Sequence, residues 1–155
     1  MFNHDLFLGF SIKKDILAKK NIMETYEEKK NLILDMIAFS TEDGVLPKKD
    51  YDFLFVIANA LDLEKGDFNN LFLLDLPVIS AKTGFRRMQQ FYRLAFLMHQ
   101  GKVLNTNESN TIHQISISMG INPDATKKVL RKMEKMPNTV ISPEALLKIY
   151  KEFHD

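Results

Sequence analysis

Apolar residues recur along this chain at a spacing of three and four positions, and glycine, proline, asparagine and aspartate separate the recurring stretches. Such spacing puts apolar side chains on one face of a helix, so each stretch is predicted to be an amphipathic helix. No stretch alternates apolar and polar residues over the length of a strand. The pattern therefore predicts an all-α protein of seven or eight helices, over about 26–40, 47–61, 67–74, 85–100, 105–119, 125–136 and 142–153.

The segments 32–72 and 90–130 carry the same apolar pattern at a constant offset of 58 positions, the separation between Val45 and Val103. A self-similarity of this length indicates two copies of one supersecondary unit, each of which buries its apolar face against the other. The matched positions are Leu46 with Leu104, Leu54 with Ile112, Ile57 with Ile115, Leu61 with Met119, Leu63 with Ile121, Leu71 with Val129, Phe72 with Leu130, Met36 with Leu94, Phe39 with Leu97 and Asp50 with Glu108.

The repeat predicts how the chain is organised. We expect one domain over 1–155, with two pseudo-symmetric halves at about 25–76 and 84–136. The N-terminal segment 1–24 begins with large apolar residues, so we expect it to fold back and cover the core. A last helix over 142–154 is expected to pack on the same core.

Local signals predict where individual helices begin and end. Glycine tolerates the left-handed conformation that closes a helix, so the first helix of the repeat is expected to stop at Asp43-Gly44. Pro47 suits the first position of the next helix, because its missing N–H needs no partner there. That helix is apolar nearly all round, which predicts a central, buried position. We expect the two halves to pack around its residues 53–61 and the helix over 91–98. Asp67 is expected to cap a short third helix.

Composition changes this picture little. The chain has 155 residues, 45% of them hydrophobic and 26% charged, as in an ordinary globular domain. Its formal net charge is +1, so nucleic acid or an anionic membrane could be bound only through a local patch. The absence of cysteine excludes disulfides and thiolate metal sites. Because no apolar run can span a bilayer and no signal peptide is recognisable, we expect a soluble cytoplasmic protein without a membrane partner.

The two hinges between paired helices resemble those of the TerB-like tellurite-resistance family. In that family a hinge reads as Asp-Gly, a short gap, an aliphatic residue and then an acid at the start of the next helix. The resemblance covers about residues 25–135. The matching segments are Thr41-Glu42-Asp43-Gly44-Val45-Leu46-Pro47-Lys48-Lys49-Asp50 and His99-Gln100-Gly101-Lys102-Val103-Leu104-Asn105-Thr106-Asn107-Glu108.

The resemblance implies an all-helical fold of two pseudo-symmetric halves with acidic residues near the hinges, and a role related to metal ions or to stress such as tellurite. The matching acids are Asp43, Asp50 and Glu108, which makes them the candidate ligands of a divalent metal ion. Gln100 departs from the pattern, and the lost carboxylate weakens a symmetric site for a hard cation. Asp50 and Glu108 also suit the first turn of a helix, where exposed N–H groups stabilise a carboxylate without any ion.

Two familiar metal sites do not fit the sequence. If Gly44 is placed on the invariant glycine of an EF-hand loop, Phe39 and Thr41 fall where the first acidic ligands are required. The four histidines are not paired at the spacing of zinc ligands on a helix.

A second class of function is suggested by residues 112–136, which read like a helix-turn-helix with a basic second helix. Its cations could contact nucleic-acid phosphates. Thr126 stands where such a motif usually buries an aliphatic residue, and the equivalent turn of the first half is acidic, so the repeat alone explains the shape. The candidate phosphate contacts are Lys127, Lys128, Arg131, Lys132 and Lys135.

No motif indicates an enzyme. The chain has no glycine-rich phosphate loop and no serine in a nucleophile elbow. Glu42 and Asp43 are adjacent, so they do not face one substrate as a general acid and base. The sequence therefore favours a non-enzymatic TerB-like accessory protein that binds another protein, with nucleic-acid binding through the helix over 125–136 as the alternative.

Overall fold

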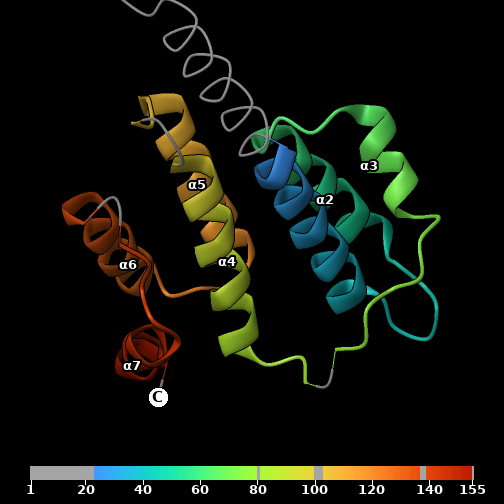
Figure 1. The fold of residues 1–155 in the computed structure, drawn as a ribbon. Coiled ribbons are helices and arrows are strands. Elements are labelled where there is room, and N and C mark those ends of the chain that lie inside the picture. The colour runs from blue at the N-terminus through green and yellow to red at the C-terminus, as the bar shows by residue number, and fades with distance from the viewer. Residues whose placement is uncertain (1–22, 80, 100–102, 137–138, 155) are drawn as a thin grey trace, which may run out of the picture.

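The computed structural model describes residues 23–79, 81–99, 103–136 and 139–154. In these ranges the chain forms seven helices and no strand (Figure 1), so the all-α prediction is confirmed. The expected packing of segment 1–24 lies almost wholly outside the described residues. The helices are residues 23–40, α2 (Lys48–Ala60), α3 (Lys65–Leu71), α4 (Gly84–His99), α5 (Thr106–Ser118), α6 (Pro123–Lys135) and α7 (Pro143–His154).

The helices pack around one core. Figure 1 shows helix 23–40, α2 and α3 gathered on one side and α6 and α7 on the other, with α4 and α5 between them. α5 contacts both α2 and α6, and α4 contacts both α6 and α7. Buried apolar residues from all seven helices form one continuous cluster. α4 contributes the most buried side chains, as expected for its central position.

Helix boundaries in the two parts of the chain are separated by the offset of the sequence pattern. α2 and α5 begin 58 residues apart, at Lys48 and Thr106, and they end 58 residues apart, at Ala60 and Ser118. α3 and α6 also begin 58 residues apart, at Lys65 and Pro123, although α6 continues further. The pair α2–α3 and the pair α5–α6 therefore begin at equivalent positions of the 58-residue sequence pattern.

The turns that follow α2 and α5 have the same backbone conformation. Asp62 has φ 59° and Gly120 has φ 74°, and these left-handed residues are again 58 positions apart. A non-glycine residue tolerates this conformation best when it is aspartate or asparagine. Three backbone hydrogen bonds of the first turn recur 58 positions later in the second. In the turn after α2 they run from Leu61 N to Ile57 O, from Asp62 N to Asn59 O and from Leu63 N to Ala58 O. In the turn after α5 they run from Met119 N to Ile115 O, from Gly120 N to Ile117 O and from Ile121 N to Ser116 O.

Two buried positions that the 58-residue offset matches are apolar in the first half of the repeat and polar in the second. Ala58 and Phe68 are both buried and apolar in the first part. At the corresponding positions, Ser116 and Thr126 are also buried, and their hydroxyl groups hydrogen-bond to each other. The threonine hydroxyl also lies 3.3 Å from the carbonyl of Asn122. A buried polar pair of this kind is stable because each hydroxyl has a partner.

The first helix ends at residue 40, as its predicted range has it, but the expectation that Asp43-Gly44 closes it is wrong. The helix ends at Ser40, and Asp43 and Gly44 form a separate tight turn with φ 52° and 75°. Glu42 and Val45 flank this turn and exchange two backbone hydrogen bonds of 3.0 and 2.9 Å. An Asp-Gly pair is the preferred centre of a two-residue hairpin turn, and this local preference replaces the expected helix end.

Two expectations for the next helices also need correction. α2 is not buried all round, because the side chain of Val56 is 49% exposed. Asp67 does not cap α3, which begins at Lys65 after Glu64. Instead its carboxylate accepts a 2.5 Å hydrogen bond from the hydroxyl of Tyr26, which ties helix 23–40 to α3.

α7 docks on the start of α4 through a close approach at Gly84. A Cβ atom there would overlap the hydroxyl oxygen of Tyr150 and lie 3.3 Å from its Cζ. The Tyr150 ring packs against Phe85, at 5.7 Å between centroids, and stacks on His154 at 4.4 Å. The missing side chain of Gly84 therefore makes room for α7.

Candidate functional site

The three acidic residues singled out by the sequence lie in different local environments. Asp43 is an exposed residue of the tight turn, and Asp50 lies in the first turn of α2. Glu108 closes a capping box at the start of α5: its N–H donates to Asn105 Oδ1 at 2.8 Å, and its Oε1 accepts from Asn105 N at 3.2 Å. The described residues contain no group of three or more histidine, aspartate or glutamate side chains that could hold a metal ion. The structure thus does not bring the three carboxylates together.

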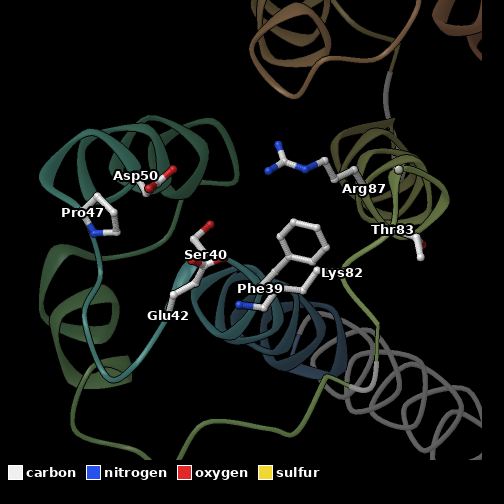
Figure 2. Close-up of a pocket in the computed structure, with 9 residues that line it drawn as sticks. Phe39, Ser40, Glu42, Pro47, Asp50, Lys82, Thr83 and Arg87 are labelled. Carbon is white, nitrogen blue, oxygen red and sulfur yellow. The ribbon is translucent and has the colours of Figure 1, made fainter.

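One of these acids lines a surface hollow of about 410 Å³. Figure 2 shows Glu42, Pro47 and Asp50 on one side of this hollow, Thr83 and Arg87 on the other, and the Phe39 ring between them. The start of α2, the start of α4 and the end of helix 23–40 meet here. Its full lining is Phe39, Ser40, Glu42, Pro47, Asp50, Lys82, Thr83, Gly84 and Arg87.

Both cations of the hollow already have partners within the chain. The ammonium group of Lys82 donates to the carbonyl of Thr41 at 2.8 Å. The guanidinium of Arg87 lies 4.9 Å from the centre of the Phe39 ring and 3.5 Å from the carbonyl of Met119. A cation over an aromatic face is attracted by the ring quadrupole. These contacts fasten Lys82, which lies just before α4, and α4 itself to the end of helix 23–40, which gives the hollow a structural role.

Helix 23–40 is fastened to α3 by the hydroxyl of Tyr26. It donates to Asp67 and accepts a 3.1 Å hydrogen bond from the backbone N–H of Glu64. Burial of the side chain and then the hydrogen bond to Asp67 raise the pKa of the Tyr26 hydroxyl above its ordinary value of 10.0. One turn later, the hydrogen bond from Lys30 to Glu27, 2.7 Å long, raises the pKa of the Lys30 ammonium group.

Replacing Tyr26 with phenylalanine is expected to lower the free energy of unfolding at neutral pH by about 1 kcal/mol, because two hydrogen bonds are lost. Since the folded state raises this pKa, the stabilisation is full below pH 10.0 and is lost as the pH rises through the folded-state pKa. Urea denaturation at a series of pH values tests this. The wild type should lose stability above pH 10.0 more steeply than the variant, and parallel curves for the two proteins would contradict the assignment.

The basic helix predicted from the sequence is α6, and its charged residues point mainly to solvent. Lys127, Arg131 and Lys135 are exposed and one turn apart. Lys128 is paired with Glu152 of α7 at 2.6 Å and lies 5.8 Å from the Phe153 ring. Lys132 is half-buried. The five cations therefore lie in different environments. Lys127, Arg131 and Lys135 form an exposed row along α6.

No family model, no curated protein and no solved structure matches this chain. The TerB-like resemblance consequently stands on the hinge residues alone. Among the described residues, no helix is both long enough and apolar enough to cross a membrane.

The most unusual surface of the described chain is an apolar segment that was not singled out from the sequence. It follows α3 directly and runs from Leu73 to Val78, and we call it the α3 edge. Its apolar residues are Leu73, Leu74, Leu76 and Val78, which are 83%, 54%, 38% and 96% exposed. Large apolar side chains gathered in one exposed stretch indicate an interaction surface, whereas single ones carry no such meaning.

Charge is also divided unevenly between the two parts of the chain. Residues 23–76 contain twelve acids and five basic residues, which gives a net charge of −7. Residues 84–136 contain nine basic residues and three acids, which gives +6. The formal net charge of +1 conceals this division, although it could have been read from the sequence by counting each part separately.

Proposed function

We propose that this chain is a non-enzymatic, TerB-like helical protein of the cytoplasm that works by binding another protein. The binding surface in this proposal is the α3 edge. The shared 58-residue offset of helix boundaries and turns supports two related halves, as the TerB-like resemblance implies. The metal-ion role implied by the same resemblance is not part of the proposal, because Asp43, Asp50 and Glu108 do not converge.

The exposure of the α3 edge carries the proposal. Burying a leucine or valine side chain is worth about 1.5–3 kcal/mol relative to leaving it in water. A stretch that leaves four such groups exposed forgoes that stabilisation within the described chain. A partner that covers the edge recovers it, which makes the edge a favourable docking surface.

Photocrosslinking in the cells that encode the protein tests this function. A benzophenone amino acid at Leu73 or Val78 is expected to give the same discrete protein adduct, because both side chains would contact the partner. Val103 is 94% exposed but lies outside the edge, so it serves as the matched control and should give no such adduct. Equal adducts from all three positions, or none from the edge, would contradict the proposal.

A second candidate function rests on the row of Lys127, Arg131 and Lys135 on α6. Three cations one turn apart can follow phosphates along a nucleic-acid backbone. If they do, a short duplex DNA should bind the full chain at low salt and dissociate as salt rises from about 0.05 M to about 0.2 M. Lys127→Ala with Arg131→Ala should flatten that salt dependence, whereas the wild-type slope in this variant would remove the candidate.

A further inference from the structure

The surroundings of the α3 edge indicate what kind of segment it accepts. We infer that its partner is a cationic amphipathic segment of another protein, one that presents leucine-like and basic side chains together. This inference rests on the proposed function, and it adds the chemistry of the partner. It joins two independent observations, the exposure of the edge and the sign of the charges around it.

Acidic residues outnumber basic ones in the part of the sequence that contains the edge. From Asp50 to Ala81 the chain has six acids and one basic residue, Lys65, and this stretch is flanked by Lys48, Lys49 and Lys82. Asp75 lies within the edge itself and is exposed, and Asp62 and Glu64 are exposed just before α3. α3 has seven residues and is therefore about 10 Å long, so Asp62 and Glu64 before its start lie about one Debye length or more from Leu73 after its end. Their attraction for a cation at Leu73 is partly screened at physiological salt, and Asp75 is the acid nearest in sequence to the apolar residues.

This arrangement selects among possible partners by charge. A basic segment is drawn toward the edge and can place its cations beside Asp62, Glu64 and Asp75 while its apolar residues cover Leu73 and Val78. An acidic segment with the same apolar residues would meet like charges on approach. Charge complementarity of this kind acts mainly on the rate and specificity of association, while the apolar contact supplies most of the affinity.

A second copy of this chain does not provide such a segment from its described residues. α6 is cationic and amphipathic, but its apolar residues Val129, Leu130 and Met133 are buried in its own core. Docking α6 on the edge of another copy would require the helix to leave that core. Among the described residues no other helix of a second copy offers these side chains, so we assign the contact to a different protein, and self-association becomes an outcome that the experiment can detect.

Fluorescence anisotropy with three labelled peptides tests the inference on the full chain. Each peptide has about 14 residues, or four helical turns, with leucine and lysine in the first, leucine and glutamate in the second, and serine and lysine in the third. The leucine–lysine peptide should bind at least about ten times more tightly than either control. Raising salt from about 0.05 M to about 0.5 M should weaken it several-fold.

Variants assign that binding to the edge. Leu73→Ser with Val78→Ser should reduce the affinity at least about tenfold, whereas Val103→Ser with Val140→Ser, which alters equally exposed apolar residues elsewhere, should leave it unchanged. Asp62→Asn, Glu64→Gln and Asp75→Asn together should reduce the preference for lysine over glutamate and leave the apolar contribution in place.

The outcomes separate the two claims. If both leucine peptides bind the edge equally well, the charge inference is overturned and the docking surface remains. If no peptide binding depends on Leu73 and Val78, the inference falls, and an adduct from the photocrosslinking experiment would show that the proposed function survives without it. Concentration-dependent self-association that Leu73→Ser abolishes would overturn the assignment to a different protein.

Discussion

Replacing Phe68 with alanine is expected to lower the free energy of unfolding by about 3–5 kcal/mol. Phe68 is 1% exposed, and its ring lies 5.7 Å from that of Tyr51, 5.8 Å from Phe55 and 5.2 Å from Phe72. These rings hold α3 against α2. A helix of seven residues is too short to be stable by itself, so α3 depends on this contact.

Equilibrium denaturation in urea measures the effect. Phe55→Ala removes a ring of the same type from a half-buried position in the same cluster, and its expected loss is smaller. Because the α3 edge follows α3 directly, Phe68→Ala should also change the amide chemical shifts of residues 72–78. A loss below about 1 kcal/mol would mean that the aromatic cluster does not hold α3 in place.

Replacing Asp35 with asparagine is expected to lower the free energy of unfolding by about 2–3 kcal/mol. The carboxylate is nearly buried, and it accepts hydrogen bonds from Arg86 at 2.7 Å and from Gln90 at 2.9 Å. Asparagine keeps the shape but loses the charge, so the guanidinium loses its ion pair. The Arg86 side chain is 40% exposed and can be partly solvated, which keeps the loss below that of a fully buried pair.

A double-mutant cycle with Arg86→Met isolates the contribution of the pair. Asp52→Asn provides the matched control, because Asp52 is an exposed aspartate on a helix, and it should change the stability by less than about 0.5 kcal/mol. Additive losses for Asp35→Asn and Arg86→Met would contradict the assignment of this pair as the link between helix 23–40 and α4.

Helices with strong local signals were predictable from the sequence. The start of α5 follows from Asn105 and Glu108, which form a capping box. α6 was predicted from residue 125 and begins two residues earlier, at Pro123, after the cap formed by Asn122. The role of Asp43-Gly44 was mispredicted because Asp-Gly suits both a helix end and a tight turn, and the sequence does not decide between them.

Features that depend on distant contacts were not predictable. Asp35 pairs with Arg86 across 51 positions, and no local pattern marks either residue as a partner. The apolar run from Phe72 to Val78 is typical of a buried segment, so its exposure could be learned only from the fold. The placement of Asp43 in a turn and of Glu108 in a cap likewise separates acids that the hinge resemblance had grouped together.

The most direct test of the account measures whether the α3 edge is open in the folded protein. The chain has no cysteine, so single variants Leu73→Cys and Val78→Cys can be followed by the rate at which their thiols react with a disulfide reagent. In the native protein both should react within about fivefold of the rate in denaturant, whereas Ala58→Cys, at a buried position that is 2% exposed, should be strongly protected. Protection of positions 73 and 78 by about a hundredfold or more would show that the folded chain itself covers the edge, and the proposed docking surface would be lost.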